Sequence, residues 1–347
     1  MQPRVFAALF IRLAYNGQTL VNYAPTRPLL LFAICALGLA LCHAQTKRPS
    51  RPEQKLQPET LVEQARKLAS EWSQASTLAA LQKFEKARLI FVARGDRANE
   101  ALMLLEAGKA QELCGDPAAA LASYQGALKV SRLAREQHVE AAALNRLGFY
   151  YIEHSDFDKA LEYGQQAKEL SVSVADRRNE AEALLLLGVS RYNRRELAEA
   201  KDYLQLSSEK FKAIGDKSAQ AQVLETFGHI SHDLGNPKEA LQLFTDALDL
   251  ANQANDLLVK GRVLNDIAIT HSILGEKQQA VEHYRDALTI LEKIGNKRQV
   301  AIALNGLGYI YFTVAQNERA LSYYSRALNL SRSVGDTERT SAILSKP

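Results

Sequence analysis

Three side chains that could bind a metal ion, or titrate near neutral pH, lie close together in the middle of the sequence. Glu225, His229 and His232 have the spacing of residues on one face of a helix, and His271 occupies the matching half of the next repeated segment. Two histidines and a carboxylate could bind zinc, and histidine changes its charge near neutral pH. The alternative is that these residues are the polar lining of a binding groove. We predict the groove, with no metal and no cofactor; zinc that changed neither thermal stability nor partner binding would exclude the metal.

Other patterns of catalytic residues are absent from the sequence. It contains no glycine-rich phosphate loop, no Cys-x-x-Cys, no His-Glu-x-x-His and no nucleophile elbow. Its many acidic residues are explained by helix caps and solvated helix faces. We therefore predict no catalytic residues and no enzyme activity in this chain.

The elements that must position these residues recur every 40 residues. Leucine occupies one column: Leu104, Leu144, Leu184, Leu224, Leu264, Leu304 and Leu344. Alanine occupies another: Ala80, Ala120, Ala160, Ala200, Ala240, Ala280 and Ala320. A glycine column holds Gly108, Gly148, Gly188, Gly228 and Gly308, with Ala268 as its exception. A fixed period of this length indicates a solenoid or another array of repeats.

Each repeat reads as two helices. Apolar residues within a unit have helical spacing, and small residues recur where helix backbones must approach closely. Asn236-Pro237 places a capping side chain before a proline at the first helical position. Gly95-Asp96 and Gly215-Asp216 place a left-handed stop before a new cap.

These columns resemble the tetratricopeptide repeat. One unit with the family's pattern contains Leu144, Leu147-Gly148, Tyr151, Ala160 and Ala167. The family's tryptophan is replaced by leucine, its closing proline is absent, and the period is 40 residues. Repeats of this length resemble the repeat regions of bacterial signalling and CHAT-type proteins and of animal adaptor proteins. The resemblance implies an all-α, right-handed superhelical solenoid of about seven antiparallel helix-turn-helix repeats.

The chain divides into five predicted parts. They are an export signal (1–44), a proline-containing linker (45–58), a degenerate first repeat (59–103), six regular repeats (104–343) and the start of an incomplete further helix (344–347).

The first part has the order of an export signal. Arg27 precedes the apolar run 29–41, and small residues follow before Gln45. The run is short for a membrane span, so we predict an exported protein, periplasmic or secreted. Three alternatives are open: a true start near Val21, lipid attachment at Cys42, and an organelle presequence.

Charge and cysteine content exclude other classes. The formal net charge is +4, and residues 1–44 supply three of those charges with no acid, which leaves +1 for the rest of the chain. This balance does not support a nucleic-acid or anionic-membrane surface. Beyond residue 44 only Cys114 is found, so no internal disulfide can form there.

In proteins of this resemblance the first helix of each repeat lines a concave groove that binds a peptide or a partner helix. The matching positions here are Asn145, Phe149, Ile152, Leu185, Tyr192, Glu225, His229, His232, Asn265, Ile269, Asn305, Tyr309 and Phe312. Three of them are asparagines at one register, and an amide side chain can both donate to and accept from a peptide backbone. The alternative is that these asparagines bond neighbouring helices.

The function expected from the sequence is that of an exported scaffold or adaptor that binds a protein or peptide without catalysis. A second hypothesis is that the chain is the sensor or docking region of a larger bacterial signalling or CHAT-protease-type protein, whose effector domain lies outside it. An open reading frame in phase beyond Pro347 would favour that hypothesis. A third is self-association through the uncapped C-terminal repeat, which a concentration-independent monomer mass would exclude.

Overall fold

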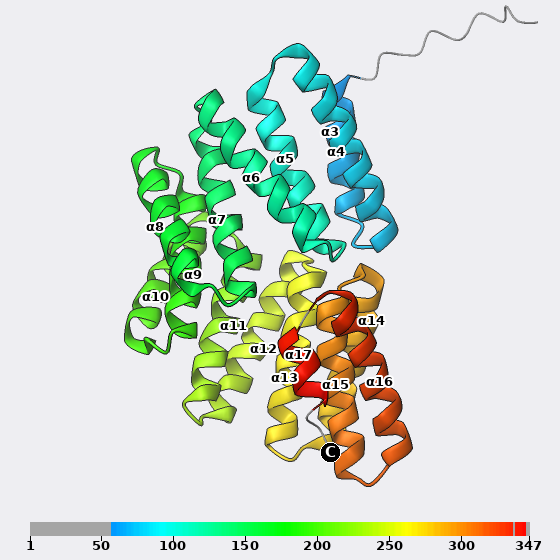
Figure 1. Cartoon of the computed structure of the whole chain (residues 1–347). Helices are drawn as coiled ribbons and strands as arrows, with labels where there is room; N and C mark the ends of the chain where they lie inside the picture. Colours follow the sequence, from blue (N-terminus) through cyan, green and yellow to red (C-terminus); the bar gives the residue numbers. More distant parts are fainter. Residues whose placement is uncertain (1–56, 336, 345–347) are drawn as a thin grey trace, which may run out of the picture. The chain divides into compact units, whose positions relative to one another are not determined.

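The structure is a computed structural model that describes residues 57–335 and 337–344. The predicted export signal, with its alternatives, and nearly all of the predicted linker lie outside the described residues. Within the described ranges every regular element is an α-helix (Figure 1), which confirms the all-α repeat solenoid.

The helices alternate between the first and the second member of successive antiparallel hairpins. In chain order they are α3 (Pro58–Ala69) and α4 (Gln74–Arg94), α5 (Arg97–Leu113) and α6 (Pro117–Ala134), α7 (Gln137–Glu153) and α8 (Phe157–Ser173), α9 (Arg177–Asn193) and α10 (Leu197–Ile214), α11 (Lys217–Asp233) and α12 (Pro237–Ala254), α13 (Leu257–Ile273) and α14 (Lys277–Ile294), α15 (Lys297–Thr313) and α16 (Asn317–Ser333), and finally α17 (Thr337–Leu344).

Capping side chains fix where the hairpins begin. Asp96 precedes α5 and accepts a hydrogen bond from the backbone N–H of Asn99, while Gly95 ends α4 in the left-handed conformation with φ +72°. Asp216 and Gly215 repeat this arrangement at α11. Asn236 departs from the prediction, because its side chain makes no capping hydrogen bond to α12.

The caps give the phase of the repeats. A unit counted from residue 104 begins inside α5, whereas the hairpin itself begins at Arg97. The helix α17 runs from Thr337 to Leu344, and the predicted incomplete helix at 344–347 lies almost wholly outside the described residues. A period gives the length of a repeat, whereas its phase comes from the caps.

The small-residue columns lie where helices pack most closely. The seven alanines from Ala80 to Ala320 are between 0% and 2% exposed. Gly228 of α11 lies beneath the ring of Phe244 on α12, where an added Cβ would come within 2.4 Å of a ring carbon. Large and small residues therefore interdigitate within each hairpin, which buries the apolar face that a single helix cannot bury alone.

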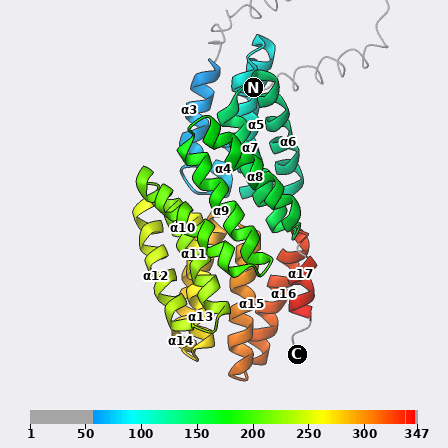
Figure 2. The same cartoon turned by 90° about the vertical axis from the view of Figure 1, so that its left-hand side faces the viewer.

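The first helices form a layer of their own. Each helix packs against the next in the chain, and in addition α5, α7, α9, α11, α13 and α15 contact one another in succession (Figures 1 and 2). Second helices of neighbouring hairpins make far fewer contacts with one another. The first helices thus line the inner, concave side of the stack, as the resemblance implied.

Among the described helices, none combines the length and the apolar character that crossing a membrane requires.

Two glycine-to-alanine substitutions should have effects of opposite sign. Gly228→Ala forces a Cβ against Phe244 and should lower the free energy of unfolding by about 1–3 kcal/mol. The Cβ added by Gly126→Ala in α6 would meet the side chain of Leu104 at ordinary contact distance, with its nearest carbon at 3.4 Å, so the gain in helix propensity should dominate and stabilise the chain by up to about 1 kcal/mol. Urea denaturation of both variants measures the difference, and equal effects would contradict the packing described.

Candidate functional site

A hollow of about 190 Å³ opens on the layer of first helices between α9, α11 and α13. We call it the central hollow; its lining residues are Tyr192, His229, His232, Asp233, Phe244, Asp266, Ile269 and Thr270. Four of these, Tyr192, His229, His232 and Ile269, are among the predicted groove residues. Three consecutive repeats therefore contribute to one concave site.

The wall of the central hollow is partly apolar and partly charged. The imidazole of His229 meets the edge of the Phe244 ring, with the ring centroids 5.3 Å apart. On the opposite side, the Tyr192 hydroxyl donates a 2.9 Å hydrogen bond to Asp233, which also pairs with the exposed guanidinium of Arg195. These contacts hold the aromatic and acidic side chains in fixed orientations.

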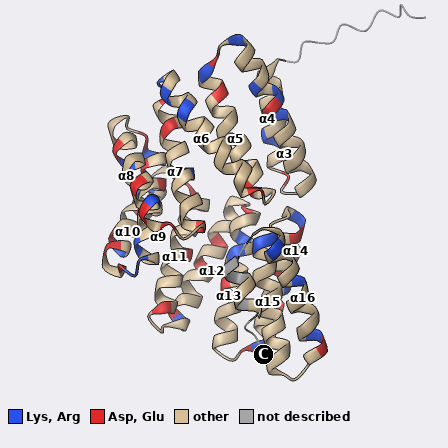
Figure 3. Ribbon diagram, in the orientation of Figure 1, with Lys and Arg blue, Asp and Glu red and all other residues tan. Residues whose placement is uncertain are grey.

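Charged side chains tie α11 to α13 beside the hollow. Arg262 donates two hydrogen bonds to Glu225, from Nε to Oε1 at 3.0 Å and from Nη2 to Oε2 at 2.6 Å. His229 Nε2 lies 3.1 Å from Asp266 Oδ2. The partners in both pairs are 37 residues apart, one helical turn short of the period, because each side chain reaches the preceding turn of the next first helix. Figure 3 shows residues of both signs along the helices.

The environment of His229 favours its protonated form. Burial by itself lowers the pKa of this imidazole, but the carboxylate of Asp266, with a further contribution from Glu225, outweighs burial and raises the pKa to about 9. The imidazolium form of His229 is therefore favoured beside Asp266, while burial raises the pKa of Glu225 and the charge of Arg262 opposes that rise.

Two of the predicted asparagines bond neighbouring helices. Asn145 is 0% exposed and its Nδ2 donates to the backbone carbonyl of Asn179, while Asn265 is 1% exposed and donates to the carbonyl of Gln299. This geometry supports the alternative reading of these residues as ties between repeats. Asn305 is half-buried, and its Oδ1 has no hydrogen-bond partner among the described residues.

The other predicted groove residues lie apart from the central hollow. Leu185 is 4% exposed and belongs to the hydrophobic core. Phe149 and Ile152 on α7 are half-buried, and Tyr309 and Phe312 on α15 are 45% and 38% exposed.

The predicted histidine cluster is only partly assembled. His271 pairs with Glu276 and stacks on the ring of His283, away from His229. His232 lines the hollow, with its Nδ1 4.0 Å from Asp233 Oδ1. Asp233, Asp266 and Phe244 were not predicted. A search for polar partners of His229 at a spacing of 37 residues, one helical turn less than the period, would have found Asp266.

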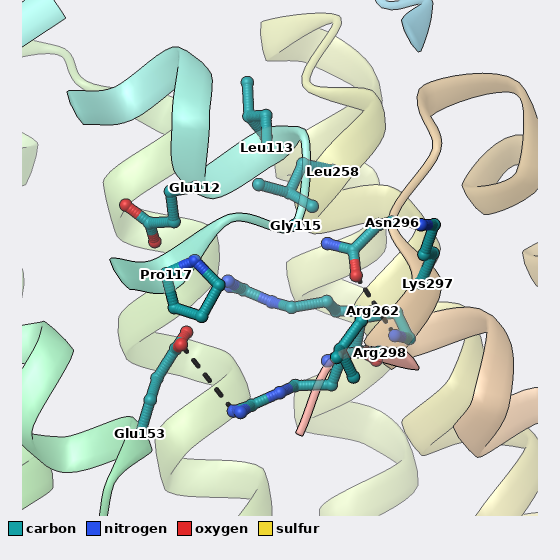
Figure 4. Close-up of a pocket in the computed structure, with 12 residues that line it drawn as sticks. Glu112, Leu113, Gly115, Pro117, Glu153, Leu258, Arg262, Asn296, Lys297 and Arg298 are labelled. Atoms are coloured by element: carbon teal, nitrogen blue, oxygen red, sulfur yellow. Dashed lines mark hydrogen bonds and ion pairs between the residues drawn. The ribbon is translucent and has the colours of Figure 1, made fainter. Parts of the chain in front are cut away.

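A second hollow, of about 120 Å³, lies where early and late repeats face each other. Glu112 and Glu153 come from α5 and α7, while Arg262 and Arg298 come from α13 and α15 (Figure 4). Glu153 and Arg298 form an ion pair of 3.6 Å across it. Arg262 therefore connects the two hollows, since it also holds Glu225 beside the first.

The fold and this layered site define an all-α helical-repeat solenoid with a concave polar face. Models of the tetratricopeptide repeat match residues 219–293 and 301–334, which span α11 to α14 and then α15 with α16. The chain therefore contains tetratricopeptide repeats, as the sequence pattern predicted. No curated protein sequence matches the chain.

Solved structures share this fold at low sequence identity. A Rap protein complexed with competence and sporulation factor has a TM-score of 0.64 at 14% identity, over 95% of this chain and 93% of that one. Aspartyl phosphate phosphatase F from Bacillus subtilis has a TM-score of 0.57 at 12% identity, over 96% and 82%. NprR in complex with its cognate peptide NprX has a TM-score of 0.55 at 12% identity, over 81% of each chain. At these identities the likeness concerns the fold alone.

Removing an asparagine tie should weaken the fold. Asn265→Ala deletes the hydrogen bonds to the Gln299 carbonyl, at 3.2 Å, and to Gln299 Oε1, and should lower the free energy of unfolding by about 1–2 kcal/mol. Urea denaturation measures the loss. An unchanged stability would contradict a structural role for the hydrogen bonds to Gln299 and would favour a ligand-binding role for Asn265.

The contribution of His229 to stability should depend on pH with a definite sign. Its pKa is raised in the folded chain, from 6.5 to about 9, so the stabilisation is fully present below pH 6.5 and is lost as the pH rises through about 9. The side chain is 39% exposed, so we discount for solvent screening and expect about 1 kcal/mol. The difference in unfolding free energy between the wild type and His229→Gln should shrink from pH 6 to pH 10. A difference that grows over that range would contradict the assignment.

Proposed function

We propose that the chain is an exported, non-catalytic interaction module that binds a peptide or a segment of a partner protein on its layer of first helices. The observation that carries this proposal is the central hollow, which three consecutive first helices build from side chains held in place by one another. Export rests on Arg27 and the apolar run 29–41, and N-terminal sequencing of the mature chain tests it: a first residue at Gln45 is expected.

The size of the central hollow favours a side chain of a larger ligand over a whole small molecule. Its volume of about 190 Å³ is below the range of roughly 300–1,000 Å³ typical of small-molecule pockets. Tyr192, Phe244 and Ile269 offer apolar contact for such a side chain, and the nearby acidic and histidine groups offer hydrogen bonds to a backbone.

The concave face offers further contacts beyond the central hollow. Tyr309 and Phe312 on α15 are exposed aromatic residues, and Ile273 at the end of α13 is 55% exposed. Exposed aromatic side chains on a preformed surface are effective anchors for a ligand. Two of the solved structures of similar fold are complexes, one with competence and sporulation factor and one with a cognate peptide, which supports peptide binding on such a scaffold.

Selection from a random peptide library displayed on phage, with the full chain as bait, tests this proposal. We expect enriched peptides whose affinity falls at least tenfold in the Tyr192→Ala/Ile269→Ala variant, because both residues line the central hollow. The matched control is Leu206→Ala, a 47% exposed leucine on the second helix α10, which should bind the same peptides with unchanged affinity.

Fluorescence anisotropy of the synthesised peptides gives the affinities, and thermal melts verify that each variant is folded. Peptides that bind the double variant as tightly as the wild type would contradict the proposal, as would a selection that enriches none.

A further inference from the structure

Glu225, His229 and Asp266 bring three metal-ligating groups together beside the central hollow. Glu225 and His229 lie one turn apart on α11, and Asp266 comes from α13. One ligand atom from each residue lies within 4.8 Å of the other two. The sequence pattern suggested Glu225 and His229, and the structure adds Asp266 from the next repeat in place of His232 and His271.

We propose that these three residues form a binding site for a divalent first-row transition-metal cation, with Zn²⁺ as the probe. Two of the three residues, His229 and Asp266, also line the central hollow, but the metal site does not require that a peptide binds there.

The donor set suits such a cation. Zinc binds histidine nitrogen and carboxylate oxygen at about 2.0–2.2 Å, usually with four ligands arranged as a tetrahedron. Ligand atoms around such an ion are about 3.4 Å apart, so the present separations require side-chain shifts of only about an ångström. Three protein ligands leave one position for water, and His229 and Asp266 line the central hollow, from which water can reach that position.

Surrounding side chains already orient the three ligands. Arg262 holds both oxygens of Glu225, and the carboxylate has lone pairs left for a metal, because each oxygen can accept twice. The Phe244 ring lies against His229 and limits its rotation. Hydrogen-bonded partners behind the ligands are a general feature of metal sites.

The same location already stabilises a positive charge. Asp266 Oδ2 lies 3.1 Å from His229 Nε2, and an oxygen of Glu225 lies within 4.8 Å of a ligand atom of each, so two carboxylates already face the position that a cation would occupy. The other charged groups near this cluster are Arg262 on α13, Asp233 and His232 on α11, and Arg195 after α9.

Isothermal titration of the metal-free full chain with ZnCl₂ at pH 8 tests the proposal. We expect one ion per chain. His229→Gln and Asp266→Asn should each weaken binding at least tenfold. Each of these two substitutions keeps a hydrogen-bonding side chain of similar size, and circular dichroism melts without metal verify that the variants fold.

The matched control is His271→Gln, because His271 pairs with Glu276 and stacks on His283 outside the cluster. Its zinc affinity should equal that of the wild type. The proposal is overturned if the wild type binds no zinc at pH 8 or if His229→Gln binds zinc as tightly as the wild type. It is also overturned if His271→Gln weakens zinc binding as much as His229→Gln does.

Discussion

The structure depends on side-chain ties between the first helices of neighbouring repeats. Apolar packing within a hairpin stabilises that hairpin, and buried clusters such as Leu204, Phe211 and Val223 also join one hairpin to the next, although leucine and alanine recur in every repeat and do not distinguish one interface from another. Specific polar pairs supply that distinction. Glu225 with Arg262 and His229 with Asp266 join α11 to α13, and Asn265 joins α13 to the start of α15. A concave face tied in this way is formed before any ligand arrives.

Burying the charged ties costs free energy, so their presence is weak evidence that they add net stability. A buried ion pair contributes little net stability compared with an apolar pair, yet removing one partner leaves an uncompensated charge that costs about 3–5 kcal/mol. Glu225 has only 11% of its side chain exposed, and it is matched by a bidentate arginine. The physical role of these pairs is therefore specificity of repeat stacking, and the hollow between α9, α11 and α13 is a consequence of it.

Much of the fold could be predicted from the sequence, because the signals are local. The pairs Gly95-Asp96 and Gly215-Asp216 at hairpin boundaries act within one turn of helix, and the small-residue columns follow directly from close helix packing. The concave location of Tyr192, His229 and Ile269 was expected from the resemblance to the tetratricopeptide repeat. Asn236 shows the limit of local reasoning: a residue suited to capping stands at the right place, and its side chain does not cap.

Contacts between repeats were harder to predict, because they depend on how far one helix is shifted along its neighbour. The period places Glu225 level with Asn265, yet Glu225 bonds Arg262, one turn earlier. The asparagines were suited both to a ligand and to a neighbouring backbone, and only their burial distinguishes the two roles. Asp266 was left out of the predicted site for the same reason, because it faces His229 from the next repeat with the same one-turn offset.

A double-mutant cycle on Glu225 and Arg262 tests the central claim most directly. Glu225→Gln, Arg262→Met and the double variant are compared with the wild type by urea denaturation. If the pair locks α11 to α13, the coupling energy should be at least about 1.5 kcal/mol. The double variant should then lose less stability than the sum of the losses in the two single variants. A coupling within about 0.5 kcal/mol of zero would show that the two side chains do not hold the repeats together, and would contradict the account of a concave face formed by ties between first helices.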